Sequence, residues 1–314
     1  MNASSKKHKT ETASSVFLGS HLSCFLRYFH LSNSTGGMGM EMLPEDCVSM
    51  ILSNTSPLDA CISSMVSSTF RSATESDVVW ERFLPADFDD LVSRLVTPPT
   101  STTKKELFLH LCNPVLIDGG RKSFELEKSS GKISYMLSAR ALSITWSNDP
   151  MYWSWRSIPE SRFSEVAELR ITSWLEIHGK IQTQFLSPNT TYGAYLVLKI
   201  YDRAYGLDSV PSEISVAVGN RLSNGTAYIR HGDQKKHQME CLFYMNRAEI
   251  LRNRAVEGDG RVTSEREDGW LEIELGEFFS GEDSEEVKMS LLEVKGYQLK
   301  GGLVIEGIEV RPKA

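Results

Sequence analysis

The chain has 314 residues, of which 40% are hydrophobic and 24% are charged, and this is the profile of a folded globular protein rather than a disordered one. Its 34 Lys and Arg residues are outnumbered by 41 Asp and Glu residues, and the net charge of −7 argues against a general nucleic-acid or anionic-membrane binder. No stretch approaches the roughly 18 to 20 apolar residues of a membrane-spanning helix, so we expect no nucleic-acid and no membrane partner.

Residues 1–40 differ in composition from the rest of the chain. They hold eight serines and carry a net charge of +3, from four Lys and Arg residues against the single Glu11. The apolar stretch that starts at Val16 is interrupted by His21, and Arg27 follows where a secretory signal has a small-residue cleavage site. We therefore interpret residues 1–40 as a disordered extension.

Residues 41–92 have the spacing of short helices. Pro44 suits the first turn of a helix. The apolar residues that recur after it on one helical face are Cys47, Val48, Ile51 and Leu52. Ser56 is a plausible N-cap of a second helix, with Pro57 at the first helical position. A unit of about 50 residues buries little core alone, so we expect a partner to cover part of its surface.

Residues 93–120 are predicted to be a helical linker. Pro98 and Pro99 interrupt the chain among hydroxyl residues. A short amphipathic helix follows around Leu107 and Leu111, and Asn113-Pro114 ends it.

From residue 121 onward the hydrophobic pattern changes to a period of two. The apolar positions that alternate along the chain are Leu169, Ile171, Leu175 and Ile177, then Ile214, Val216 and Val218, then Leu271, Ile273 and Leu275, and finally Val304, Ile308 and Val310. Between Ala194 and Ile200 both faces are apolar, as in the central strand of a sandwich. Residues 121–314 are therefore predicted to form one antiparallel β-sandwich.

The helical segment resembles an F-box. The matching residues are Leu43, Pro44, Val66, Ser67, Phe70 and Trp80. The resemblance implies that this unit docks on a Skp-type adaptor, which joins it to a cullin scaffold in an SCF-type ubiquitin ligase. Surplus apolar surface on a small helical unit needs a partner to cover it. We assign the adaptor-facing surface to Leu43, Pro44, Val48, Ile51 and Val66.

The β-rich segment resembles the phloem protein 2-type, Nictaba-like lectin domain of plants. The matching stretches include residues 122–128, 138–142, 144–146, 152–155, 158–163, 268–279 and 305–312. The implied fold is α+β by domain, a small helical F-box followed by an antiparallel all-β lectin-like sandwich. The implied function is that of a substrate receptor whose sandwich recognises a glycoprotein target through N-acetylglucosamine or an N-glycan.

Trp146 and Trp153 occupy the positions that this family uses for sugar binding. A Trp face stacks on the apolar face of a pyranose while polar neighbours fix the hydroxyls. Residues 147–150 between them are predicted to form a turn that brings both rings to one rim, although a Trp in a sandwich is ordinarily a core residue. Trp155 shares a strand face with Trp153 and is assigned to packing, and Trp174 and Trp270 are assigned to the core.

Glu272 and Glu274 share one face of a predicted strand. Two interpretations beyond a solvated, charged sheet face are open: they accept hydrogen bonds from sugar hydroxyls, or they are the paired carboxylates of a glycoside hydrolase. No phosphate-binding glycine loop or nucleophile elbow supports an enzyme, and we expect none.

A metal or cofactor is not expected either. His231, His237 and Cys241 have loose metal-ligand spacing but no convincing fourth ligand. The acidic stretch between Glu257 and Glu286 lacks the pattern of a calcium loop and is interpreted as solvated edges and loops. The five cysteines, Cys24, Cys47, Cys61, Cys112 and Cys241, are far apart with no C-x-x-C pair, which favours a reducing compartment, the cytoplasm or the nucleus.

These patterns leave three hypotheses for function. The leading one is a receptor subunit of a ubiquitin ligase, with the F-box on the adaptor and the sandwich on the target. The second is a free carbohydrate-binding lectin of the cytoplasm or nucleus with a non-functional F-box. The third is a carbohydrate-active enzyme that uses Glu272 and Glu274. Capture of a Skp-type adaptor separates the first two.

Overall fold

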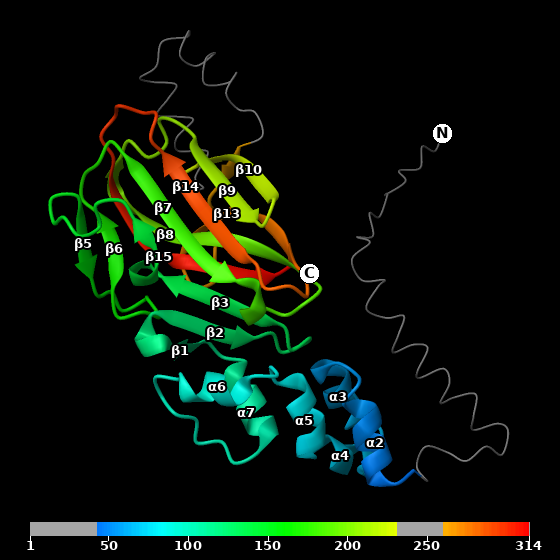
Figure 1. Cartoon of the computed structure of the whole chain (residues 1–314). Helices are drawn as coiled ribbons and strands as arrows, with labels where there is room; N and C mark the ends of the chain where they lie inside the picture. The colour runs from blue at the N-terminus through cyan, green and yellow to red at the C-terminus, as the bar shows by residue number, and fades with distance from the viewer. Residues whose placement is uncertain (1–42, 231–259, 314) are drawn as a thin grey trace, which may run out of the picture. The chain divides into compact units, whose positions relative to one another are not determined.

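The computed structural model describes residues 43–230 and 260–313. It divides into two compact units with the boundary between Leu84 and Pro85 (Figure 1). The extension at residues 1–40 and the metal candidates His231, His237 and Cys241 lie outside the described residues.

The first unit is helical, as predicted. Its helices are α2 (Glu45–Leu52), α3 (Pro57–Ser63), α4 (Ser68–Thr74) and α5 (Asp77–Phe83). The predicted start of α3 is confirmed, because the Ser56 hydroxyl accepts from the Asp59 amide at 3.1 Å and Pro57 is the first helical residue. Trp80 closes the small core: its indole donates to the Thr74 carbonyl at 2.6 Å, and its ring meets Phe83 edge-on.

Two further helices belong to the second unit. They are α6 (Phe88–Ser93) and α7 (Lys104–Leu111). Thr103 and Glu106 form a capping box at the start of α7. Arg94 donates to both carboxylate oxygens of Asp118, at 2.9 and 3.1 Å. Residues 93–120, predicted as a linker, therefore belong to the compact unit of the sandwich.

The rest of the second unit consists of two β-sheets (Figure 1). The nine-stranded sheet contains β1 (Val115–Ile117), β2 (Lys122–Leu126), β3 (Ile133–Ser138), β5 (Trp153–Arg156), β6 (Val166–Leu169), β8 (Thr190–Tyr205), β12 (Ser264–Glu265), β13 (Leu271–Ser280) and β15 (Gly301–Pro312). The six-stranded sheet contains β4 (Ser143–Ile144), β7 (Leu175–Gln182), β9 (Ser212–Val218), β10 (Arg221–Tyr228), β11 (Arg261–Val262) and β14 (Glu286–Glu293).

The strand order confirms the predicted antiparallel sandwich with one exception. The large sheet has the order β1-β2-β3-β15-β8-β13-β12, with β6 also on β15 and β5 on β6, and the small sheet has the order β11-β10-β9-β14-β7-β4. Only β10 and β11 pair in parallel among the described strands. The two sheets approach closely at Gly179 of β7: a Cβ there would lie 2.9 Å from the end of the Ile308 side chain of β15, so a larger residue would force that side chain to shift.

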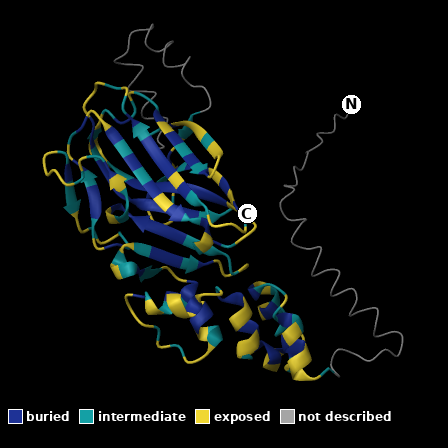
Figure 2. Cartoon of the chain, in the orientation of Figure 1, coloured by how far each residue is buried: buried dark blue, intermediate teal, exposed yellow. Residues whose placement is uncertain are grey.

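The predicted strand faces are present. Leu175, Ile177, Gly179 and Ile181 of β7 are buried, and Glu176, His178 and Lys180 between them are not. In β8 every residue from Tyr192 to Leu198 is buried (Figure 2). This strand is covered on both faces because Val197 joins a second apolar cluster with Met136, Phe163, Val166, Trp270 and Val304.

Candidate functional site

Trp146 is the most unusual residue of the turn between β4 and β5. Its backbone φ is 59°, in the left-handed region that bulky residues avoid. Its side chain is 45% exposed, and its ring stacks on Tyr152 with 4.8 Å between centroids and 29° between planes. A strained backbone that presents a large apolar ring to solvent is typical of a binding site.

Two other tryptophans hold this strained turn. The Trp153 indole donates to the carbonyl of Thr145 at 3.1 Å, and the Trp155 indole donates to the carbonyl of Ser147 at 2.9 Å. These carbonyls belong to the residues on either side of Trp146. The two indoles of β5 therefore fix Trp146 from both flanks.

This geometry corrects the predicted two-tryptophan rim. Trp153 is only 2% exposed, so its ring offers no face to a ligand, and the prediction that it lies at the rim is wrong. Trp155 packs as expected, with the Arg140 guanidinium 3.6 Å above its ring, and Trp270 is 1% exposed in the core. Trp174, assigned to the core, is instead 42% exposed.

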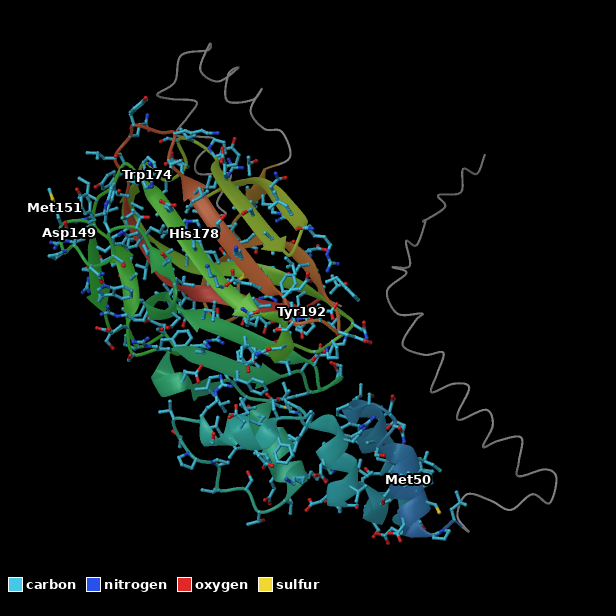
Figure 3. The ribbon with its side chains drawn as sticks, viewed as in Figure 1. Met50, Asp149, Met151, Trp174, His178 and Tyr192 are labelled. Carbon is cyan, nitrogen blue, oxygen red and sulfur yellow. The ribbon has the colours of Figure 1, made fainter. Side chains whose placement is uncertain are left out.

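The predicted turn at residues 147–150 is confirmed, and it is firmly held. The Asp149 amide donates to the Trp146 carbonyl at 3.0 Å, and the Asp149 carboxylate accepts from the Met151 amide at 2.8 Å. Arg170 donates to the carbonyl of Pro150 at 2.9 Å. Asp149 and Met151 project from the domain on this loop, where Met151 is 66% exposed (Figure 3).

Glu176, on the neighbouring strand β7, is a polar residue that the sequence analysis missed. Its Oε2 accepts from the Trp174 indole at 2.8 Å and from the Thr145 hydroxyl at 2.9 Å, and its Oε1 lies 2.9 Å from Nε2 of His178. These bonds, with that of His178 the strongest influence, lower the pKa of Glu176 to about 2. Glu176 lies two residues after Trp174 and two residues before His178 in the sequence, and this spacing is the signal that was available.

Glu272 and Glu274 share a face of β13 as predicted, but arginine and lysine side chains occupy both carboxylates. Arg311 donates to both oxygens of Glu272, at 2.7 and 2.8 Å, and Arg266 donates to the same residue at 2.7 Å. Glu274 accepts from Lys313 at 3.2 Å. Carboxylates held in this way are ion-pair partners within the sheet rather than free acceptors.

Glu309 extends the same ion-pair network. It accepts from Arg266 at 2.6 Å and from Arg311 at 2.7 Å. Burial raises the pKa of Glu309, but the hydrogen bond and charge of Arg266 outweigh burial and leave the pKa below its usual value.

The structure does not bring the two candidate pairs together. Between β5, which carries Trp153, and β13, which carries Glu272 and Glu274, lie β6, β15 and β8. Four strand spacings correspond to roughly 19 Å. Trp153 therefore cannot share one sugar ring with Glu272 or Glu274, and the ion pairs of both carboxylates leave them outside the candidate site.

The F-box unit presents apolar side chains to solvent. Those most exposed are Met50 on α2, Leu58 on α3, Met65 and Val66 after α3, and Val78 on α5, with exposures from 44% to 73%. Val66 was assigned to the adaptor surface, as were Pro44, which is exposed, and Leu43 and Ile51, which are half-buried. Val48 was assigned to the same surface, but it is fully buried in the unit's own core, so that assignment is wrong.

Among the described residues, no cluster of His, Cys, Asp and Glu side chains is arranged to hold a metal ion. Nor does any helix in the described ranges have the length and apolarity needed to cross a membrane.

The chain matches two family models, "F-box domain" over residues 40–82 and "Phloem protein 2" over residues 132–312. It is 55% identical over 279 residues to F-box protein PP2-B15 of Arabidopsis thaliana, covering 87% of this chain and 96% of that protein. F-box protein VBF of the same plant is 54% identical over 281 residues, covering 87% and 100%. F-box protein PP2-B13, also of that plant, is 56% identical over 280 residues, covering 87% and 99%.

Similarity to solved structures is much weaker. A Podospora anserina GH26-CBM35 β-(1,4)-mannanase aligns at 9% identity and a TM-score of 0.28, over 58% of this chain and 28% of that one. A score this low does not inform the fold.

Proposed function

Because the chain belongs to the family of plant F-box proteins that carry a phloem protein 2 domain, we propose that it is the substrate receptor of an SCF-type ubiquitin ligase. The single observation that carries this proposal is the presence in one chain of an F-box at residues 40–82 and a phloem protein 2 domain at residues 132–312. The F-box binds a Skp-type adaptor, and through it a cullin, while the β-sandwich binds the target. Ubiquitin transfer itself is the task of other subunits.

The exposed apolar side chains of the F-box unit support adaptor binding. Met50, Met65, Val66 and Val78 are each at least half exposed on a unit whose core is already closed by Trp80. Apolar residues left at the surface of a small unit favour association with a partner that covers them.

The test is capture of a recombinant Skp-type adaptor by the full-length chain. Val66→Glu places a charge on a residue that is 50% exposed, and we expect adaptor capture to fall at least about tenfold, because an unpaired charge at an apolar interface costs more than about 1.4 kcal/mol. The matched control is Val96→Glu in the other unit, where the valine is 52% exposed, and it should capture the adaptor like wild type.

One outcome would contradict the assigned adaptor surface, and another would contradict adaptor binding itself. Equal capture by Val66→Glu and wild type would place the adaptor surface elsewhere. No capture by the wild-type chain, together with retained glycan binding, would favour the free lectin with a non-functional F-box.

For the sandwich, we propose that the target is a glycoprotein recognised through N-acetylglucosamine or an N-glycan core. The support is Trp146, an exposed and rigidly held indole beside Tyr152, which is suited to stacking on a pyranose. The cysteine distribution favours action in the cytoplasm or the nucleus. Direct binding of the full-length chain to the N-acetylglucosamine tetramer, measured by calorimetry, tests this part independently of the adaptor.

A further inference from the structure

Trp174 is an exposed aromatic residue whose position is fixed from several sides. The Trp174 amide donates to the Thr172 hydroxyl and the Thr172 hydroxyl donates to the Trp174 carbonyl, both at 3.0 Å. Beneath this turn, Lys300 donates to the Ser173 carbonyl at 2.9 Å, and Lys300 is buried in an ion pair with the buried Glu293. An aromatic face held so firmly loses little freedom when a ligand covers it.

Glu176 links Trp174 to the turn that carries Trp146. One oxygen of its carboxylate accepts from both the Trp174 indole and the Thr145 hydroxyl, so these two groups are held side by side. Thr145 directly precedes Trp146 in the chain. The Glu176 carboxylate therefore fixes the exposed Trp174 indole and also Thr145, the residue that precedes the exposed Trp146.

The strand pairing places the two tryptophans at one end of the β4–β7 pair. Ile144 lies opposite Ile177, and the Thr145 amide donates to the Glu176 carbonyl at 3.1 Å. Because β4 and β7 are antiparallel, the end of β4 lies beside the start of β7. Trp146 follows the end of β4 and Trp174 precedes the start of β7, so both tryptophans lie at this end of the strand pair. Trp174 directly precedes β7 and His178 lies on it; both are labelled in Figure 3.

We propose that Trp174 is a second stacking surface for a saccharide chain bound at Trp146, and that Glu176 is the residue that positions both. This inference rests on the proposed glycan binding and extends it from one sugar ring to an oligosaccharide of at least two rings. His178 is the polar contact of the second subsite: its Nε2 is engaged by Glu176, and its Nδ1 makes no hydrogen bond within the described ranges.

The surroundings of Trp174 favour a saccharide over a peptide as the occupant. The side chains bound to it or next to it in the network are a carboxylate, a hydroxyl and an imidazole, namely Glu176, Thr145 and His178. A pyranose presents an apolar C–H face to an aromatic ring and hydroxyls at its edge; both Glu176 oxygens are engaged within the network, and Nδ1 of His178 is the atom left for a sugar hydroxyl.

The experiment measures binding of the full-length chain to the N-acetylglucosamine monomer and tetramer. Trp174→Ala should weaken tetramer binding about tenfold, since one lost stacking contact is worth about 1.4 kcal/mol, and should leave monomer binding unchanged. Phe279→Ala is the matched control, because Phe279 is also 42% exposed but lies on β13, and it should bind both ligands like wild type.

Glu176 is tested by rescue. Glu176→Ala should weaken tetramer binding as much as Trp174→Ala, whereas Glu176→Gln keeps an acceptor oxygen for the indole and should retain most of the affinity. The tryptophan signal in the near-ultraviolet circular dichroism spectrum should decrease in Glu176→Ala but not in Glu176→Gln. A general loss of stability would not produce this selective decrease.

The outcomes separate this inference from the function on which it rests. If the wild-type chain binds the tetramer and Trp174→Ala binds it with the same affinity, the second subsite alone is overturned. Equal loss of monomer and tetramer binding in Trp174→Ala also overturns it, because Trp174 would then be part of the first subsite. Absence of any binding by the wild-type chain overturns the proposed glycan binding together with this inference.

Discussion

At Trp146 the backbone is held in a conformation that costs of order 1 to 3 kcal/mol for a residue with a side chain. Hydrogen bonds from Trp153 and Trp155 to the carbonyls on either side offset this cost. The arrangement uses core tryptophans to support one exposed tryptophan. It follows that two residues of the same type, seven positions apart, have opposite roles in the structure: Trp146 presents its ring to solvent and Trp153 supports the fold.

We therefore expect Trp146→Gly to separate binding from stability. Glycine adopts φ of 59° without strain, and the removed ring was 45% exposed, so the melting temperature should change by only a few degrees. Affinity for the N-acetylglucosamine tetramer should fall by about 1 to 3 kcal/mol through lost stacking and buried area. Calorimetry and thermal melting of the same variant test both statements.

Trp153→Ala is the complementary variant and should behave in the opposite way. It leaves a cavity at a residue that is 2% exposed and removes the hydrogen bond to Thr145, so unfolding should become easier by about 3 to 5 kcal/mol. A Trp153→Ala variant with wild-type stability and lost sugar binding would restore this residue to the binding surface.

The sequence predicted part of this site and missed the rest for a physical reason. The i, i+2 spacing of Trp153 and Trp155 correctly predicted a shared strand, because strand periodicity is local. Which tryptophan faces solvent depends instead on a left-handed turn at Trp146 and on contacts with β7, a strand more than twenty residues away. Two partners of Glu176, Trp174 and His178, are two residues away in the sequence, but its contact with Thr145 beside Trp146 arises only through this long-range pairing.

At the scale of secondary-structure elements, Arg94 and Asp118 attach α6 to the sandwich. The hydrogen bond from Arg94, aided by Lys122, lowers the pKa of Asp118 from 3.8 to about 2. A carboxylate whose pKa is lower in the folded state stabilises the fold above its ordinary pKa, and this stabilisation disappears as the pH falls toward 2.

Asp118→Asn should therefore lower the free energy of unfolding by about 1 to 2 kcal/mol at pH 7, after allowance for partial exposure of the pair. Asparagine tolerates the left-handed backbone of Asp118, where φ is 54°, so the effect comes from the charge. Denaturant unfolding at several pH values should show the two proteins converging between pH 4 and pH 2. Parallel curves over this range would contradict the role of the ion pair.

Several strands were recognisable in the sequence and others were not. Leu271, Ile273 and Leu275 of β13 alternate cleanly because only one face of this part of the strand is in the core. The start of β14 lies in the acidic stretch interpreted as edges and loops, and its burial pattern includes three consecutive buried residues, Met289, Ser290 and Leu291. Its apolar residues Val287, Met289 and Leu291 nevertheless alternate with Lys288 and Ser290, so the period of two was present and was overlooked because of the acidic composition at its start.

At the scale of the whole molecule, the change of hydrophobic period near residue 121 was a poor guide to the start of the second compact unit, which begins at Pro85. The Pro98-Pro99 break is typical of a linker, yet α7 buries Leu107, Phe108 and Leu111, and Leu95 bridges to Ile117. Such contacts join segments across a loop and leave no periodic trace in the sequence. The F-box and the phloem protein 2 domain were recognisable because their motifs are local in sequence.

A fragment of residues 85–314 should consequently be more stable than one of residues 121–314. The shorter fragment loses three buried apolar side chains of α7 and the Arg94–Asp118 pair, which together should lower the melting temperature by at least about 5 to 10 °C. Differential scanning calorimetry of both fragments checks this. Equal melting temperatures would show that residues 93–120 are dispensable to the sandwich.

The position of β15 in the large sheet has a consequence for biosynthesis. This strand, at residues 301–312, pairs with β3, β6 and β8, so the centre of the sheet is supplied last. At about 5 to 20 residues per second, a ribosome that has completed the F-box needs roughly ten to forty seconds more to reach β15. During that interval the nascent chain carries a completed F-box and an unfinished phloem protein 2 domain, and under the proposed function a truncated product that lacks β15 would occupy adaptors without delivering a target.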